Sequence, residues 1–426
     1  MPGLNITSEI GTLKRVILHG PGPEVEAMTP SEAAQDLYND IIPLEAVKAE
    51  HDQLRAFLAL VSKVYELEDL LAESLASPGS RFEFLTALSG LCPIKSRIDE
   101  LMSLHPAELA CLVIEGLPSL PSSLAGALSP RSFSMRPLPN TYFMRDTAAV
   151  FRDWAISSAT AFDVRLMESI ITRFVFTRHP ELRAKGLLFD GPEERNRFVT
   201  IEGGDILVIS PNVLAIGVSE RTTPDAIELL AKNAGRAFEE PVTVLAVVLP
   251  KARATIHLDM VFTMIDRDAA LIFEPVVSGP SKAEVVRIDV RPDGKDSFRQ
   301  VEGGLLPGLK ELGFDLEPVL CGGGDTLYGE REQWWSGANS FAFGPGKIVT
   351  YSCNARTLEA LSKAGFEVKL ASEFLPSRCP GSESAKPSAG DPADYGRLVV
   401  GFEGIELARG GGGARCMTMP VEREAI

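Results

Sequence analysis

The sequence has few of the residues that stabilise small extracellular or metal-bound domains. Only six cysteines occur in 426 residues, at positions 92, 111, 321, 353, 379 and 416. That density is too low for a disulfide framework, and no two of the cysteines form the Cys-x-x-Cys pair of a structural zinc site. The five histidines include no His-x-x-x-His spacing. We therefore expect reduced thiols and no structural metal.

Long apolar runs and an excess of positive charge are also absent. No stretch of about 18 apolar residues without a charge occurs, so we expect no transmembrane helix and no membrane partner. The first residues form neither a basic nor a long apolar signal region, and we expect a cytoplasmic protein. The net charge is -16, from 42 Lys and Arg against 58 Asp and Glu. Because such a balance repels phosphate backbones, we expect no nucleic-acid partner.

The composition is that of a globular chain, 45% hydrophobic and 23% charged. Residues 12–19 predict a strand, and the apolar spacing from 31 to about 73 predicts helix. Residues 75 to about 130 lack strand alternation and predict several short helices, with a linker over 118–130. Residues 376–395 are rich in Pro, Gly, Ser and Ala and predict a mobile surface insertion.

Two stretches of the chain resemble each other. In both, a Gly-Gly-Asp turn precedes two short strands and a helix that starts after an Arg-Thr pair. The first covers the turn 203–205, strands at 206–209 and 213–218 and a helix at 223–234, and the second covers the turn 323–325, strands at 340–343 and 347–351 and a helix at 357–364. A recurring strand–strand–helix unit favours a repeat architecture in which each unit buries its apolar face against its neighbours.

One histidine lies in a stretch typical of a functional strand. The apolar run 254–263 alternates like a strand, so His257 and Asp259 fall on one face. A solvated strand face is the alternative interpretation. Because strongly apolar strands are usually buried on both sides, we favour a shared cavity for the two polar groups.

One cysteine follows a run of four glycines, 410–413. Such a run costs conformational entropy and is typical of a loop that brings backbone close to a ligand. Cys416 is therefore a candidate reactive thiol, with a flexible tail that carries a buried cysteine as the alternative. Cys321, which also precedes glycines, is the weaker candidate. Residues 417–420 predict a short terminal strand.

Several carboxylates accompany these residues. Asp146 lies in a strand-like run, and Glu202 and Asp205 flank a Gly-Gly turn that could equally be structural. Together with His257 and Asp259 they could form an N/O metal site for Zn, Mn or Fe. Because only one of these candidate ligands is a histidine, zinc binding is poorly supported, and we expect no metal.

Taken together, the motifs resemble those of the arginine deiminases, within the guanidino-group modifying enzymes. The match runs in the family's order over nearly the whole chain, in these segments: Ser8-Glu9-Ile10-Gly11, Glu50-His51-Asp52, Leu67-Glu68-Asp69-Leu70-Leu71, Asn140-Thr141-Tyr142-Phe143-Met144-Arg145-Asp146, Ile201-Glu202-Gly203-Gly204-Asp205, Gly217-Val218-Ser219-Glu220-Arg221-Thr222, His257-Leu258-Asp259-Met260-Val261-Phe262-Thr263, Arg331-Glu332-Gln333-Trp334 and Arg415-Cys416-Met417-Thr418-Met419-Pro420. The resemblance implies an α/β fold, a five-bladed α/β propeller (pentein) with an inserted helical module. It divides the chain into propeller residues 1–73, the module at 74–133 and the remaining propeller at 134–426.

The resemblance also implies catalytic roles. Cys416 matches the nucleophile and His257 the general acid and base. Asp146 and Asp259 match the two carboxylates that hold the guanidinium, and Glu202 matches an acid beside the histidine. A thiolate suits this role because a guanidinium carbon is a poor electrophile, and two carboxylates make directional, charge-assisted bonds to a planar guanidinium.

Four further residues match the family's substrate pocket. Arg165 and Arg221 match the pair that binds the α-carboxylate of the substrate, and Asn140 and Phe143 match residues that line the pocket. Arg165 taken alone would instead predict a helix-surface pair with Glu168.

The implied activity is hydrolysis of L-arginine to L-citrulline and ammonia through a covalent cysteine adduct, by a hydrolase of guanidinium C–N bonds that needs no cofactor. A homo-oligomer, dimer or tetramer, is a further expectation. Another guanidino substrate, or an inactive paralogue that binds arginine or serves as a scaffold, stays an alternative. The chain departs from the family at Gly20 and Gly411, where Arg is common, and in an insertion near 371–396.

Overall fold

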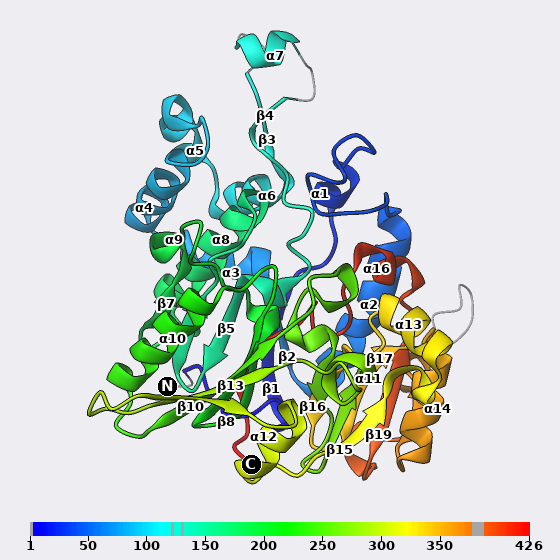
Figure 1. Ribbon diagram of the computed structural model, residues 1–426. Coiled ribbons are helices and arrows are strands. Elements are labelled where there is room, and N and C mark those ends of the chain that lie inside the picture. The colour runs from blue at the N-terminus through cyan, green and yellow to red at the C-terminus, as the bar shows by residue number, and fades with distance from the viewer. Residues whose placement is uncertain (1–2, 121–122, 129–131, 377–386) are drawn as a thin grey trace.

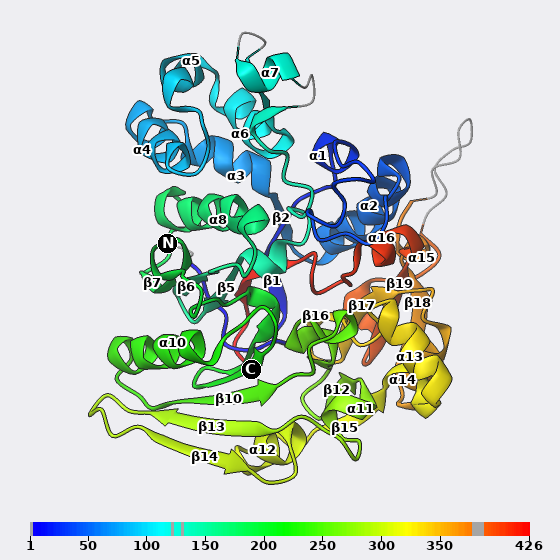
Figure 2. The same cartoon turned by 45° about the horizontal axis from the view of Figure 1, so that its top comes forward.

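The computed structural model describes residues 3–120, 123–128, 132–376 and 387–426. In this part of the chain, five sheets of three or more strands alternate with helices (Figures 1 and 2). Each of these sheets contains an antiparallel pair of strands and a parallel strand that follows a helical connection. The mixed α/β class and the expected strand–strand–helix repeat are confirmed.

The first two complete units follow each other in sequence. They comprise β5 (Ala148–Phe151), β6 (Trp154–Ser157), α8 (Leu166–Arg178) and β7 (Leu187–Asp190), then β8 (Ile206–Ser210), β9 (Val213–Val218), α10 (Pro224–Ala237) and β10 (Val242–Val248). Two further strands, β13 (Val285–Val290) and β14 (Ser297–Val301), extend the second sheet, with β14 at its edge. The strands at its centre are almost continuously apolar and buried, as expected for parallel strands covered on both faces.

The next two units carry more insertions. The third comprises β11 (Phe262–Met264), β12 (Ala269–Ile272), α11 (Glu274–Val277), α12 (Leu305–Glu311) and β15 (Glu317–Leu320). The fourth comprises α13 (Thr326–Trp334), β16 (Phe341–Gly344), β17 (Lys347–Tyr351), α14 (Ala355–Lys363), β18 (Glu367–Leu370), α15 (Ala371–Phe374) and β19 (Leu398–Phe402), and α16 (Ile405–Gly410) follows it. The pair β13–β14 interrupts the third unit in sequence but belongs to the second sheet.

The fifth sheet joins the two ends of the chain. It comprises β1 (Leu13–Leu18), β2 (Lys63–Glu66) and β20 (Met419–Arg423), with α1 (Pro23–Glu26) and α2 (Leu44–Val61) between the first two strands. Strand β1 pairs antiparallel with β20 and parallel with β2. The strand expected near the C-terminus is thereby confirmed. The five-bladed propeller stays a prediction, which these five repeated units support.

The helices of the predicted module project from one side of the sheets (Figure 1). They are α4 (Pro78–Ser89), α5 (Ile98–Ser103), α6 (Pro106–Glu115) and α7 (Leu124–Leu128), with the short strands β3 (Leu117–Pro118) and β4 (Phe133–Met135). Helix α3 (Leu67–Ser74) precedes them and ends at the predicted boundary. Prolines begin α4 and α6, where a missing N–H is tolerated. The module shares its core with α8, since the rings of Phe84 and Phe174 lie 4.8 Å apart. The division into domains stays a prediction.

Three expectations from the sequence need comment. Continuous helix over 31–73 is wrong, because turns precede α2 and the strand β2 follows it, paired with β1. The expected linker holds α7, and its residues 121–122 and 129–130 lie outside the described part. Half of the insertion at 376–395 lies outside it as well, since 377–386 are not described. None of the helices in the described ranges is long and apolar enough to cross a membrane.

The repeat places equivalent positions of every unit at one end of the sheets. The segment just before the first strand of each antiparallel pair carries a polar residue that enters the molecular centre. These residues are Glu9 before β1, Asp146 before β5, Asp205 before β8, Asp259 before β11, Asn339 before β16 and Cys416 before β20. All six are buried. The fold thus gathers side chains from six distant segments.

Because β20 completes the sheet that β1 begins, its removal should prevent folding. We predict that deleting residues 419–426 abolishes cooperative thermal unfolding, since Met419, Val421 and Arg423 are at most 1% exposed. Burial of an apolar side chain of this size contributes about 1.5–3 kcal/mol. Deleting only the exposed residues 425–426 is the matched control and should leave the melting temperature nearly unchanged. A normal melting curve for the longer deletion would show that closure by β20 is dispensable.

Candidate active site

Seven of the nine site residues expected from the sequence line one small cavity. Its volume is about 40 Å³, enough for only a few water molecules. The lining residues are Leu37, Asn140, Phe143, Asp146, Arg165, Arg221, Ile256, His257, Gly410, Gly411, Gly412 and Cys416. The remaining two expected residues, Glu202 and Asp259, contact lining residues from behind. The cavity as described is closed around its polar groups.

Cys416 lies between the glycine loop and β20, and only 3% of it is exposed. Its amide donates to Oδ1 of Asn339 (3.2 Å), its carbonyl accepts from the amide of Arg145 (2.9 Å), and its Sγ lies 3.9 Å from Oδ2 of Asp259. Burial raises the pKa of the thiol well above its usual value, and the anions Asp259 and Asp146 raise it further. These surroundings favour the neutral thiol of Cys416, and a cation that enters would favour the thiolate.

His257 lies between two carboxylates. Its Nε2 is 2.9 Å from Oε2 of Glu202, and its Nδ1 is 3.5 Å from Oδ1 of Asp146. Burial lowers the pKa of the imidazole, but Asp146 and Glu202 outweigh it and raise that pKa to about 9. Burial raises the pKa of Glu202, yet Arg221 and His257 bring it down to about 2. The site thus holds an imidazolium beside a carboxylate near neutral pH.

The backbone at these residues differs from the expected strands. Residues 253–255 and 258–260 form two turns of 3-10 helix, and strand structure begins only at Phe262. The amide of Leu258 donates to Oδ1 of Asp205 (2.9 Å), so a side chain takes the place of a neighbouring strand. The strand expected around Asp146 is also wrong. Met144–Thr147 is a 3-10 turn, and the amide of Arg145 within it donates to the carbonyl of Cys416 and not to a neighbouring strand of a sheet.

Asp146 and Asp259 each use Oδ2 in an ion pair with an arginine, whereas neither Oδ1 accepts a hydrogen bond, although Oδ1 of Asp146 lies 3.5 Å from Nδ1 of His257. Oδ2 of Asp146 pairs with Arg165, and Oδ2 of Asp259 accepts from Nη1 of Arg415 at 2.8 Å. The two Oδ1 atoms are buried and accept no hydrogen bond from the described residues. A buried acceptor without a partner costs about 1–3 kcal/mol, so these two oxygens indicate a ligand that donates hydrogen bonds.

Arg165 is buried, with 3% of the residue exposed, so the helix-surface interpretation is wrong about its location. The pair with Glu168 does exist: Nε and Nη2 donate to Oε2 of Glu168 at 2.8 and 2.7 Å. Nη1 bonds to Asp146, and Nη2 also reaches the carbonyls of Asn140 and Phe143, both at 3.2 Å. Burial raises the pKa of Glu168 to about 7 despite the arginine.

Arg221 is bound less tightly than Arg165. Its Nη1 is 3.5 Å from Glu202, and its Nε is buried without a hydrogen bond, 3.6 Å from Glu220. The guanidinium lies 4.7 Å from the ring centre of Phe162. Arg221 therefore keeps donors free beside the cavity that an anionic group could use.

Behind the cavity lies a buried pair that sequence reasoning did not assign. Nε and Nη2 of Arg415 donate to the two carboxylate oxygens of Glu9 at 3.0 and 3.1 Å, while its Nη1 holds Asp259. Arg415 and the neighbouring guanidinium of Arg145 lower the pKa of Glu9 to about 2 against the effect of burial. Both residues lie within matching motifs, but 406 positions separate them, so no spacing in the sequence links them.

Asp146, Glu202 and His257 also form a group whose ligand atoms lie within 4.8 Å of one another, as a metal site would require. The same atoms already contact one another as acceptors and donors. Because the pKa of His257 is about 9, a metal would have to displace its proton near neutral pH. The donor set therefore fits a proton-transfer site better than a metal site.

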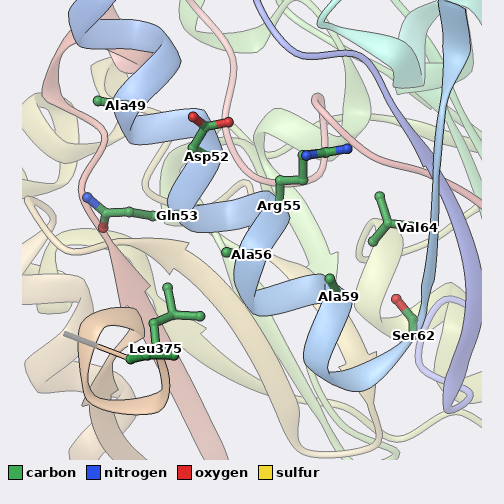
Figure 3. Close-up of a pocket in the computed structure, with 10 residues that line it drawn as sticks. Ala49, Asp52, Gln53, Arg55, Ala56, Ala59, Ser62, Val64 and Leu375 are labelled. Atoms are coloured by element: carbon green, nitrogen blue, oxygen red, sulfur yellow. The ribbon is translucent and has the colours of Figure 1, made fainter. Parts of the chain in front are cut away.

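Two other features were candidates for a site. Cys321 is buried, and burial raises its pKa to about 12, with Thr357 as its hydrogen-bond partner and no histidine beside it. A larger hollow of about 670 Å³ lies beside α2 and is lined by Asp52, Arg55 and the alanines of that helix and by Leu375 (Figure 3). Neither feature combines a nucleophile with an acid or base.

The site and the fold together invite comparison with known proteins. A family model described as arginine deiminase matches residues 115–423, more than half of the chain. The chain belongs to the arginine deiminase family.

Curated members of the arginine deiminase family match the chain over its whole length. The arginine deiminase of Limosilactobacillus fermentum is 35% identical over 99% of both chains. The enzyme of that name from Treponema denticola is 34% identical over 100% of both, and that from Lactococcus lactis subsp. cremoris is 33% identical over 100% of this chain and 99% of its own.

Solved structures share the fold at lower identity. SxtG, an amidinotransferase from Microseira wollei, matches with a TM-score of 0.52 at 13% identity over 99% of this chain and 98% of its own. The N-terminal domain of ArgZ, an arginine dihydrolase from cyanobacteria, matches with a TM-score of 0.51 at 12% identity over 96% and 97%. At these identities the likeness shows the fold alone.

The charge of His257 gives a direct test of the geometry of this site. Because its pKa is raised from 6.5 to about 9, the imidazolium and the stability it contributes are present below pH 6.5 and lost as the pH rises through about 9. NMR titration of the histidine ring signals, with His257→Asn for assignment, should show this pKa. Glu202→Gln should lower it by about one unit or more. A pKa near 6.5 in the unchanged chain would contradict the geometry.

Proposed function

We propose that this protein hydrolyses L-arginine to L-citrulline and ammonia through a covalent adduct on Cys416. The observation that carries this proposal is the pair of buried oxygens that accept no hydrogen bond, Oδ1 of Asp146 and Oδ1 of Asp259, beside a thiol and an imidazolium. Membership of the arginine deiminase family and relatives of that name over the full length support the substrate.

A guanidinium has the hydrogen-bond donors that these two carboxylate oxygens lack. It is planar and cationic, and its N–H groups can donate to both free oxygens at once, in charge-assisted bonds. Held between Asp146 and Asp259, its carbon faces Cys416, whose Sγ lies 3.9 Å from the second carboxylate. The positive charge also lowers the cost of ionising the buried thiol, so the substrate itself activates the nucleophile.

The first half of the reaction forms the adduct. As the cation binds, Cys416 loses its proton to solvent, and Sγ attacks the guanidinium carbon to form a new C–S bond. His257 then donates its proton, held at the Nδ1 that faces Asp146, to one terminal nitrogen. The C–N bond breaks, ammonia leaves, and an amidino group stays on sulfur. Glu202 keeps the imidazole oriented through Nε2.

The second half releases the product. The neutral His257 accepts a proton from a water molecule, whose oxygen attacks the amidino carbon. The C–S bond breaks, the departing sulfur of Cys416 takes up the second proton of the water, which restores the thiol, and the carbon becomes the ureido carbonyl of citrulline. The imidazolium is restored, so the sum is arginine and water in, citrulline and ammonia out. Each step uses side chains only.

Two arginines would bind the other end of the substrate. Arg221 has a buried Nε without a hydrogen bond and is ready for a carboxylate. Arg165 is bound to Asp146 in the closed cavity, so both must exchange partners. The α-carboxylate would replace Asp146 on Arg165, while the substrate guanidinium takes the carboxylate of Asp146. Asn140 and Phe143 would hold Arg165 through their carbonyls and form the wall of the pocket.

The alternatives differ in what arginine does when it is added. An arginine-binding or scaffold protein would bind it without release of ammonia, and an enzyme for another guanidino compound would prefer that compound. The intact set of Cys416, His257, Asp146 and Asp259 in one cluster favours hydrolysis. Assay of citrulline and ammonia decides among the three. The cytoplasmic location and the homo-oligomer stay predictions.

The role of Cys416 as nucleophile can be tested by replacing its sulfur atom with oxygen. Cys416→Ser should reduce arginine hydrolysis by at least about a thousandfold, because a buried serine is not activated by a nearby cation as a thiol is. Cys321→Ser makes the same change at an equally buried cysteine and should keep nearly full activity. Mass spectrometry of the acid-quenched His257→Ala reaction should show the amidino adduct on Cys416. Substantial hydrolysis by Cys416→Ser would refute the assignment.

Recognition of the carboxylate end can be tested with agmatine, which lacks that group. Agmatine can take the carboxylate of Asp146 but gives Arg165 nothing in return, which leaves this buried cation without one of its two carboxylate partners. Such a loss costs several kcal/mol, so kcat/KM should fall at least about a hundredfold relative to arginine. Comparable efficiency on the two substrates would contradict the roles of Arg165 and Arg221.

A further inference from the structure

The glycine loop forms one wall of the cavity and lies against three side chains of other segments. A Cβ at Gly410 would lie 2.4 Å from Oη of Tyr142, and one at Gly412 would lie 2.5 Å from the ring of Phe143. Gly411 has a φ of +96°, and a Cβ there would lie 3.0 Å from Nη2 of Arg253. The loop can therefore take this position only because Gly410, Gly411 and Gly412 have no side chains.

Arg253 is the one cation among these three neighbours. Its Nη2 donates to the carbonyl of Arg409 at 3.1 Å, and its guanidinium lies 5.1 Å from the ring centre of Trp334. Its Nε, Cζ and Nη2 all lie within 3.6 Å of the Cβ position of Gly411, so the guanidinium lies flat against the loop. Arg253 bridges the loop to α13.

Arg253 has no acidic partner among the described residues. No ion pair joins it to a carboxylate there, and burial alone lowers its pKa. A partly buried guanidinium usually pairs with a carboxylate, because its desolvation is costly. Here a carbonyl, a glycine backbone and an indole ring take that place, which indicates a role in holding the loop.

The position of Arg253 in the chain relates it to both His257 and Cys416. Arg253 begins the 3-10 turn that precedes Ile256, which lines the cavity, and His257. The loop that it holds leads directly to Cys416. One side chain thus connects the segment of the proton donor to the segment of the thiol.

The other attachments of this segment hold different positions. Tyr351 donates through Oη to the carbonyl of Gly412 at 2.8 Å, on the Cys416 side of the loop, and two further contacts hold α16. Glu50 of α2 accepts the amides of Glu406 and Leu407 at 3.2 and 2.8 Å and fixes the start of α16, which lies beside α2 (Figure 2). At the loop end, the side chain of Arg409 pairs with Asp40 on the surface. An exposed ion pair of this kind contributes about 0–1 kcal/mol and is screened by salt. Arg253 is therefore the main contact that holds the end of α16 nearest the cavity.

We infer that Arg253 is a positioning residue, which keeps the glycine loop 409–412 closed over the cavity and so sets the approach of Cys416 to the substrate. A cavity of about 40 Å³ cannot admit an amino acid without movement of its wall. The loop must open for entry and close again for reaction. The kinetic part of this inference rests on the proposed arginine hydrolysis, whereas the closure of the empty site does not.

Amide hydrogen exchange of the ligand-free protein tests the closure. Arg253→Ala should raise exchange at Gly411, whose amide bonds to the carbonyl of Ala408 at 3.0 Å, by up to about tenfold. Exchange in the strands of the five sheets should stay unchanged. Asp40→Asn is the matched control, because it removes the surface attachment and should change exchange little in high salt. Unchanged exchange at Gly411 in Arg253→Ala would overturn the inference.

Steady-state kinetics test the consequence for the reaction. Arg253→Ala should raise KM for L-arginine about tenfold while kcat changes less, and Arg253→Lys, which keeps a donor for the Arg409 carbonyl, should recover part of the loss. Should Arg253→Ala lower the melting temperature strongly, Arg253→Gln carries the same test with a shape closer to the original. Faster exchange with unchanged KM and kcat would refute the positioning role. Faster exchange in a protein that hydrolyses no arginine would refute the proposed function and keep the closure by Arg253.

Discussion

The need to balance charges in a dry centre governs this structure. Three buried cations each bridge two carboxylates: Arg415 joins Glu9 and Asp259, Arg165 joins Asp146 and Glu168, and His257 joins Asp146 and Glu202. None of these groups can stay charged alone at such depth, because removal of one partner leaves an ion without compensation. Each side chain is thus fixed by its neighbours, and the few oxygens that the network leaves unused mark the place for one more cation.

The repeated fold supplies the network because it brings corresponding points of every unit to one end of its sheets. Each unit contributes a short turn before its first strand, and the turns carry different chemistry: acids, an amide, an imidazole with an acid, and a thiol. Most of the reactive groups therefore sit on 3-10 turns whose amides bond to other site residues, as Leu258 bonds to Asp205. The scaffold can stay regular while the site remains irregular.

Much of this arrangement was predictable from the sequence, and there are physical reasons why the rest was not. Two of the five units show a Gly-Gly-Asp turn, strands and a helix in the sequence. The unit β5–β7 is continuous but lacks that turn, and the other two are divided by the chain ends or by the insertion β13–β14, which hides the period. His257 and Cys416 stood out by their neighbours, although alternation suggested a strand where the structure has 3-10 turns. Apolar spacing reports burial, and a buried turn leaves the same signal as a buried strand.

The charge pairs were beyond the reach of the sequence. Arg165 predicted a surface pair with Glu168, and only the structure shows that pair buried with Asp146 as its third member. The contact between Glu9 and Arg415 spans 406 positions, and that between Arg253 and Gly411 joins different units. No local rule connects such residues, because their distance is set by how whole units pack.

The pairing of β1 with β20 also sets an order of events during synthesis. Translation at roughly 5–20 residues per second places tens of seconds between the emergence of Glu9 and that of Cys416. During that interval one edge of β1 has no partner strand, and an open edge invites association with other chains. The thiol arrives within the same last segment that closes the sheet. A nascent chain therefore assembles this buried cluster only after β20 has been synthesised and has docked on β1.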